Sequence, residues 1–226
     1  MKRVIVIPAL NEAPAIEEVV VQAVRVADAV IVVDDGSSDG TGAVAERAGA
    51  LVVRHSVNRG TGAATATGLA AALRVGADLI VTMDADGQHR AEDAERIFDR
   101  LAAGEVDFVS GSRLLGVKEG AGRMPLRRRV YNWIGNFLTM LLFGVWVSDS
   151  QSGLRGLSAR AASSIELRTN GFEICSEMVY QVRKQGLRYA EVSVPAIYTE
   201  HSLSKGQSFV NGVRTATRLI FRRLIG

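Results

Sequence analysis

The chain has 226 residues, of which 47% are apolar and 23% charged, the balance of an ordinary folded protein. Its net charge of +3 is too small for binding driven by nucleic-acid phosphates, so we predict no nucleic-acid partner. A single cysteine, Cys175, excludes an internal disulfide, and residues 1–12 lack a charged and then apolar leader, which predicts a cytoplasmic protein. The longest apolar run, residues 133–147, is shorter than the ~20 residues that cross a bilayer.

Short β-branched runs alternate with alanine-rich stretches of helical periodicity in the first half of the chain. The runs predict strands at residues 4–8, 29–33, 50–54, 78–84 and 108–112, and the stretches predict helices at 17–27, about 40–48, 63–75 and 91–103. Continuous apolar strands separated by helices form parallel sheets that are covered on both faces. We therefore predict an α/β fold whose ligands bind beyond the carboxyl ends of the strands.

The second half of the chain departs from this alternation. After a basic stretch, the expected elements are an apolar helix at 133–147, a polar turn DSQSGLRG at 149–156, a helix at 173–185, short strands at 189–194 and 196–199, and a final helix at about 207–224. No low-complexity linker and no repeat interrupts the chain. We therefore predict one domain over residues 1–226, in which the second half completes the site of the first.

The loops after the strands carry acids rather than phosphate-binding glycines. The loop after the first strand, PALNEA, has no glycine that would let a pyrophosphate approach, which excludes a dinucleotide-binding fold. Asp84 and Asp86, in MDADGQH, are two residues apart on an extended segment, so both carboxylates face one small volume and repel unless a cation lies between them. Hard oxygen ligands suit Mg²⁺ or Mn²⁺, which bind diphosphate oxygens in turn. In a second interpretation, Asp86 only caps the next helix and Asp84 only ends a strand.

Seven segments follow one another from residue 4 to about 208: IVIPALNE, IVVDDGSSDGT, NRGTGAATATG, MDADGQH, VSGSR, DSQSGLRGLS and EVSVPAIYTEHSLSKGQS. In that order they resemble the signature of family 2 glycosyltransferases, and within that family the dolichyl- or polyprenyl-phosphate sugar transferases. The resemblance implies a GT-A fold, with a mostly parallel central sheet and helices on both faces. It also implies a nucleotide-sugar-binding half at 1–112, an acceptor-side half at 113–206 and a C-terminal helix at 207–226.

The resemblance further implies a metal-dependent transfer of a sugar, with inversion, from a GDP- or UDP-sugar to a polyprenyl or dolichyl phosphate. The nucleoside is then expected against Pro8, Ala9, Asn11, Glu12 and Asp35. The metal, Mg²⁺ or Mn²⁺, is expected among Asp84, Gln88 and the principal ligand Asp86, and the phosphates near Arg113, Arg128 or Arg129, and Lys205. A metal and cations stabilise the charge that develops on the leaving nucleoside diphosphate. One position departs from the family, which commonly has a lysine where this chain has Thr61.

Asp149 is the one acid in the turn at 149–156, where it is either a catalytic general base or a turn-forming residue. A hydroxyl acceptor needs a base, whereas a phosphate acceptor is already an anion. Because the second half offers many cations and only this plausible base, we predict a phosphate acceptor and expect Asp149→Asn to retain much of the turnover. Two alternatives stay open: a saccharide hydroxyl as acceptor, and a catalytically weak nucleotide-sugar-binding partner of a membrane protein, which Thr61 favours.

Three further predictions concern the second half. Glu173 and Glu177, one helical turn apart, can share a face toward the site, but a solvated face is the default expectation for such a pair. Trp133 with the nearby phenylalanines is expected in the core. The last helix places a row of arginines, Arg214, Arg218 and Arg222, beside an apolar stripe. Such a helix favours contact with an anionic membrane or a membrane protein, and hence a peripheral position at the inner face of the cell membrane.

Overall fold

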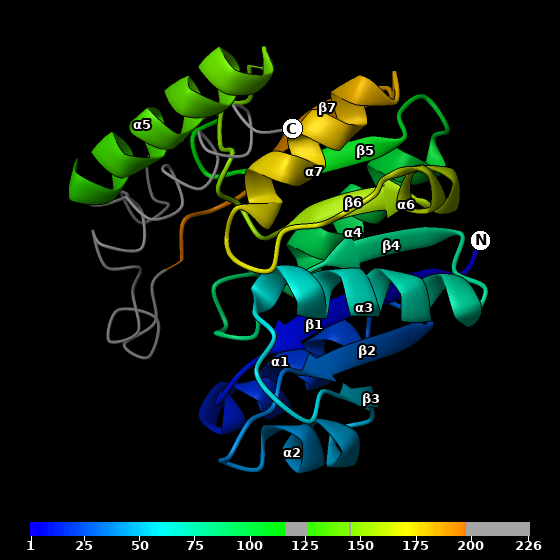
Figure 1. Ribbon diagram of the computed structural model, residues 1–226. Helices are drawn as coiled ribbons and strands as arrows, with labels where there is room; N and C mark the ends of the chain where they lie inside the picture. Colours follow the sequence, from blue (N-terminus) through cyan, green and yellow to red (C-terminus); the bar gives the residue numbers. More distant parts are fainter. Residues whose placement is uncertain (116–125, 145, 198–226) are drawn as a thin grey trace.

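The computed structural model describes residues 1–115, 126–144 and 146–197 (Figure 1). The strands are β1 (Arg3–Ala9), β2 (Ala29–Asp34), β3 (Leu51–Arg54), β4 (Leu79–Thr82), β5 (Phe108–Ser112), β6 (Arg155–Ser158) and β7 (Tyr189–Ser193). The helices are α1 (Ala13–Ala23), α2 (Thr41–Arg47), α3 (Thr61–Arg74), α4 (Ala91–Ala102), α5 (Leu126–Phe143), α6 (Ala159–Ser164) and α7 (Ile174–Lys184).

The strands form one seven-stranded sheet in the order β3-β2-β1-β4-β6-β5-β7. All neighbours pair in parallel except β6, which runs antiparallel to both β4 and β5. Alternate residues of β1 point to opposite faces: Ile5 and Ile7 pack with α1, α2 and α4, while Val4 and Val6 pack with α3, α6 and α7. The predicted mostly parallel sheet with helices on both faces is confirmed.

Several predicted boundaries were wrong. The last two residues of the turn predicted at 149–156 are the first two of β6. The sequence RGLS has no strand pattern, but it forms a strand because β4 and β5 pair with it on either side. Helix α6 was not predicted. Helix α5 begins at Leu126 and ends at Phe143, where Gly144 adopts a left-handed conformation with φ of 64°. The strand expected at 196–199 is absent at 196 and 197, and its other residues and the final helix lie outside the described residues.

The aromatic residues of α5 were also predicted wrongly. Trp133 is 60% exposed and Phe137 is 41% exposed, so neither belongs to the core. No helix in the described part of the chain is long and apolar enough to cross a membrane.

An ion pair at the amino end of β5 predicts how stability depends on pH. Asp107 is buried and accepts hydrogen bonds from Arg188 N and Nε, both at 3.1 Å. These bonds from Arg188 outweigh desolvation and lower the pKa of Asp107. A carboxyl whose pKa is lower in the folded state than its unfolded value of about 3.9 stabilises the fold above that value, and the contribution is lost as the pH falls through the folded pKa.

Asp107→Asn is therefore expected to reduce the free energy of unfolding by about 1–2 kcal/mol at pH 7 and by less at about pH 3, as measured by urea unfolding. Asp99→Asn is the control, because Asp99 is 63% exposed in its pair with Arg3 and should contribute about 0.5 kcal/mol or less. An equal loss for Asp107→Asn at both pH values would contradict the argument.

Candidate active site

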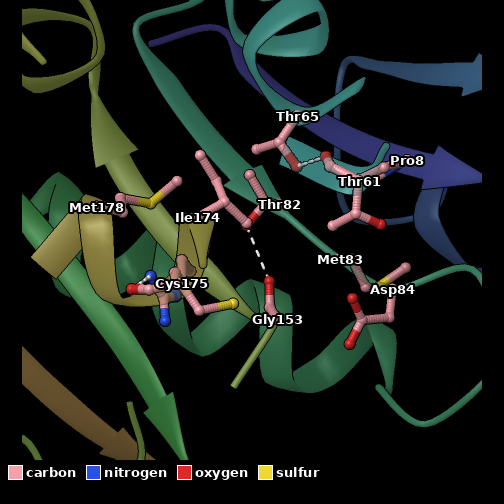
Figure 2. A pocket seen from close by; sticks show the side chains of 11 residues that line it. Pro8, Thr61, Thr65, Thr82, Met83, Asp84, Gly153, Ile174, Cys175 and Met178 are labelled. Atoms are coloured by element: carbon pink, nitrogen blue, oxygen red, sulfur yellow. Dashed lines mark hydrogen bonds between the residues drawn. The ribbon is translucent and has the colours of Figure 1, made fainter. Parts of the chain in front are cut away.

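The predicted site residues meet at the carboxyl edge of the sheet. Pro8 and Ala9 end β1, Asp35 follows β2, Asp84 and Asp86 follow β4, and Arg113 follows β5. Because β6 runs antiparallel, its amino end reaches the same edge and brings the loop that carries Asp149 there. A pocket at this edge is shown in Figure 2, and its lining includes Pro8, Thr61, Thr65, Asp84, Gly153 and Cys175. The sheet thus joins residues from both halves of the chain into one site.

The two acids after β4 are held by polar neighbours. The half-exposed side chain of Asp84 lies 3.1 Å from His89 Nε2, and Asp86 accepts from Gln88 N at 3.1 Å and Gln88 Nε2 at 2.6 Å. Desolvation raises the pKa of Asp84 but is outweighed by the hydrogen bond and charge of His89, so the pKa lies below its ordinary value. Desolvation and then the charge of Asp84 raise the pKa of Asp86. The two carboxylates therefore repel, as the sequence predicted.

This donor set fits a divalent cation. Asp84 and Asp86 supply hard oxygens, and their repulsion is relieved by positive charge between them. Among the described residues no three His, Cys, Asp or Glu side chains gather as a metal site, so two carboxylates would leave most positions of an octahedral ion to other oxygens. The side-chain amide of Gln88 donates a hydrogen bond to Asp86 and so orients that carboxylate. Its role as a metal ligand stays a prediction.

The loops after β1 and β2 are tied together. Asn11 has a φ of 53°, its N–H donates to Ser37 Oγ at 3.0 Å, and its Oδ1 accepts from Ser38 N at 3.0 Å. The N–H of Glu12 donates to Thr41 Oγ1 at 2.8 Å. These bonds hold Asn11 and Glu12 in a fixed loop beside the end of β1, which is where the nucleoside is predicted to lie.

Asp35 has its carboxylate occupied by protein groups. One oxygen lies 2.6 Å from His55 Nδ1 and accepts from Arg59 N at 2.9 Å, and the other accepts from Gly60 N at 2.7 Å. The side chain is only 4% exposed. Asp35 therefore fixes the loop that starts α3, and its contact with a nucleoside stays a prediction.

The glycines of NRGTG allow the backbone at the start of α3 to contact the backbone of Thr169 and Asn170. Gly62 N donates to Asn170 O at 2.8 Å, and a Cβ on Gly62 would lie 2.0 Å from Thr169 O. Glu177 of α7 holds this neighbouring loop, since it accepts from Thr169 N at 2.8 Å and from Thr169 Oγ1 at 2.6 Å. The prediction of a solvated face for Glu173 and Glu177 was wrong, because both are buried. Spacing along a helix does not tell which neighbouring loop will cover it.

Asp149 is buried and bonded to an arginine. Arg113 Nε and Nη2 donate to its two carboxylate oxygens at 2.7 and 3.0 Å, and Arg113 N adds a third bond at 3.1 Å. Asn132 Nδ2 donates to the same carboxylate at 2.9 Å. Desolvation raises the pKa of Asp149, but the bonds and charge of Arg113 outweigh it, so the pKa is lowered. With no exposed surface and a lowered pKa, Asp149 has the geometry of a group that orients Arg113 rather than of a base.

Two residues of the same turn were missed in the sequence. Arg155 is 2% exposed and donates to Ser152 O at 2.9 Å, to Ser150 O at 2.7 Å and to Cys175 O. Gly153 lies against Asp84, and its carbonyl accepts from Thr82 Oγ1 at 2.9 Å. The motif SGLR at the end of the predicted polar turn, with its glycine and its arginine, could have identified both as site residues.

Gly153→Ala is expected to reduce turnover strongly, by about 10²-fold, with little loss of stability. A Cβ there would lie 2.3 Å from both carboxylate oxygens of Asp84, so the carboxylate must swing away from the site. The measurements are the transfer rate and thermal unfolding. Gly104→Ala is the opposite control: its φ of 73° strains an alanine, but nothing lies nearby, so stability falls and turnover stays. Full turnover of Gly153→Ala would contradict this placement of Asp84.

The phosphate contacts of three residues stay predictions. Arg128 and Arg129 lie in the first turns of α5, but their side chains are outside what the structure describes. Lys205 and the arginine row of the C-terminal helix lie wholly outside the described residues.

The mostly parallel sheet with helices on both faces has the architecture of the GT-A glycosyltransferase fold. Residues 4–165 match the profile described as glycosyl transferase family 2, and the chain belongs to this family of glycosyltransferase enzymes. The fold is similar to that of a solved glucosyl-3-phosphoglycerate synthase from Mycobacterium tuberculosis in complex with Mn²⁺, UDP-glucose and phosphoglyceric acid. The TM-score is 0.71 at 22% identity, over 98% of this chain and 79% of that one.

Two relatives are similar over most of their length. The chain is 35% identical over 240 residues to the UDP-N-acetylglucosamine–dolichyl-phosphate N-acetylglucosaminyltransferase of Methanococcus voltae, covering 97% of this chain and 95% of the relative. It is 32% identical over 197 residues to the polyprenol monophosphomannose synthase of Mycolicibacterium smegmatis, covering 83% and 72%. The predicted resemblance to this family is confirmed.

Proposed function

We propose that the protein transfers a sugar from a nucleotide-sugar donor to a polyprenyl or dolichyl phosphate, with inversion and with the help of Mg²⁺ or Mn²⁺. The observation that carries this proposal is the pairing of Arg113 with Asp149 beside the two acids Asp84 and Asp86. Asp149, the candidate general base, is buried and bonded to Arg113. An acceptor that needs no base, such as a phosphate, agrees with that arrangement. The two relatives are named for dolichyl-phosphate and polyprenol acceptors, which supports it.

In the proposed reaction, an oxygen of the acceptor phosphate attacks the anomeric carbon of the sugar as its bond to the donor diphosphate breaks. Asp84 and Asp86 would hold the cation, which supplies positive charge to the diphosphate leaving group. Arg113 keeps 18% of its side chain exposed while Asp149 fixes its guanidinium. It is therefore a preorganised cation at the edge of the site, where developing negative charge is stabilised without reorganisation.

The decisive experiment measures nucleoside diphosphate release from a panel of UDP- and GDP-sugars, with and without a polyprenyl phosphate. We expect release with one base and one sugar, dependent on the lipid phosphate and on added Mn²⁺ or Mg²⁺. Full activity in excess chelator would contradict the metal, and a saccharide hydroxyl that proves a better acceptor would replace the lipid phosphate.

A further inference from the structure

Helix α5 has its polar and apolar faces the opposite way round from a helix on the surface of a water-soluble domain. Among the side chains of α5 that the structure describes, three polar ones are buried against the protein: Asn132, Asn136 and Thr139, all at 5% exposure or less. Asn132 and Asn136 bond the loop 148–150 at distances of 2.6 to 2.9 Å, and the hydroxyl of Thr139 lies 3.1 Å from that of Ser176. The spacing of four and three residues makes this one continuous stripe.

The side chains of α5 that the structure describes as pointing away from the protein are apolar. They form what we call the outer face of α5, exposed by 41 to 65%: Val130, Trp133, Ile134, Phe137 and Leu141. The rings of Trp133 and Phe137 stack on it with centroids 5.7 Å apart. Figure 1 shows α5 at the margin of the molecule, apart from the sheet. A surface helix normally presents polar residues to water, and a contiguous exposed apolar patch marks an interaction site.

We propose that the outer face of α5 lies in the interfacial layer of an anionic lipid bilayer. An indole ring is favoured at this depth, and Trp133 is 60% exposed. The first turn of the same helix carries three consecutive arginines, residues 127–129, and such a basic run attracts anionic headgroups. A protein partner could bind the apolar face without the arginines. An anionic bilayer uses both, because its interface takes up the aromatic face and its headgroups attract the basic run.

The position of α5 relative to the site agrees with a bilayer. Asn132, on its inner stripe, donates to the carboxylate of Asp149 that orients Arg113. The helix that would rest on the lipid is therefore bonded directly to Asp149, the residue that orients Arg113 at the proposed active site. This step rests on the proposed function, in which the acceptor is taken from a membrane.

The test uses tryptophan as its own depth gauge. The chain has two tryptophans, so Trp146→Phe leaves Trp133 as the single probe in the full chain. Vesicles of phosphatidylcholine and phosphatidylglycerol should shift its emission to the blue, and brominated phosphatidylcholine should quench it. Adding Ile134→Asp with Leu141→Asp should weaken partition by about tenfold or more, because two apolar side chains leave the lipid. The matched pair Leu51→Asp with Val57→Asp, at 54% and 65% exposure in and just after β3, should leave partition unchanged.

Three results would overturn the proposal. One is vesicle binding without quenching of Trp133. Another is a Trp133 that acrylamide does not reach in the free protein, because residues 198–226 or a second copy cover the outer face. The third is an equal loss of partition in the α5 and β3 variants. The vesicles contain neither donor nor acceptor, so this test is separate from the proposed function. Transfer to a detergent-dispersed polyprenyl phosphate without quenching overturns only the α5 proposal, and quenching without transfer overturns only the proposed function.

Discussion

Asp86→Asn is expected to lower the transfer rate by about 10³-fold or more while the protein stays folded, because it removes half of the carboxylate pair that would hold the cation. The fold should not suffer, since burial and then the charge of Asp84 raise the pKa of Asp86, and the substitution removes a carboxylate whose charge both effects disfavour. The measurements are nucleoside diphosphate release over a Mn²⁺ titration and thermal unfolding.

The control for Asp86→Asn is Asp99→Asn, which neutralises an exposed carboxylate on α4 away from the site. It should leave both the rate and its Mn²⁺ dependence unchanged. An Asp86→Asn variant that keeps more than about a tenth of the wild-type rate would show that the pair is not a metal site, because a lost ligand costs more than that.

Asp149→Asn is expected to lower turnover by about 10²-fold and stability by about 2–3 kcal/mol, which reverses the expectation drawn from the sequence. An asparagine would set an amide NH₂ against the guanidinium of Arg113 and break the two-oxygen grip at 2.7 and 3.0 Å. The guanidinium of Arg113 would then no longer be held in one orientation, and a misplaced cation stabilises the negative charge of the leaving group less well.

A double-mutant cycle separates orientation from base catalysis. If Asp149 acts only through Arg113, then Asp149→Ala, Arg113→Ala and the double variant should lose turnover to nearly the same extent, without a new limb in the pH profile. Asp107→Asn is the matched control, because it also breaks a buried carboxylate–arginine pair, at the other end of β5, and should cost stability but not turnover. Additive losses with a shifted pH profile would identify Asp149 as a base and return the saccharide hydroxyl as acceptor.

The acids after β4 show how far a local pattern reaches. Two acids that are two residues apart lie close together, so the repulsion between Asp84 and Asp86 was predictable. The extended segment assumed for them was wrong, because β4 ends at Thr82 and Asp86 lies in a turn. Burial and then the charge of Asp84 raise the pKa of Asp86. The same local argument missed Gly153, because its contact with Asp84 joins loops about 70 residues apart in the chain. No pattern within either loop predicts that contact.

Helix α5 shows where periodicity misleads. Apolar residues at helical spacing predicted a helix, and the helix exists, but the pattern does not say which face is covered. The usual assumption that the apolar face is inside placed Trp133 in the core. The structure instead covers the stripe of Asn132, Asn136 and Thr139, because loop 148–150 and α7 offer that stripe hydrogen-bond partners.

The sequence by itself determined the α/β alternation, the parallel first half of the sheet, the family and the edge at which the acids gather. These follow from strand and helix periods and from the order of short motifs, which are properties of neighbouring residues. Only the tertiary structure decided that β6 runs antiparallel within the sheet, and that Asp35, Glu177 and Asp149 are occupied by protein partners. The role of a carboxylate depends on which donor reaches it, and these donors come from segments between about 8 and 36 residues away, brought close by packing that no local pattern encodes.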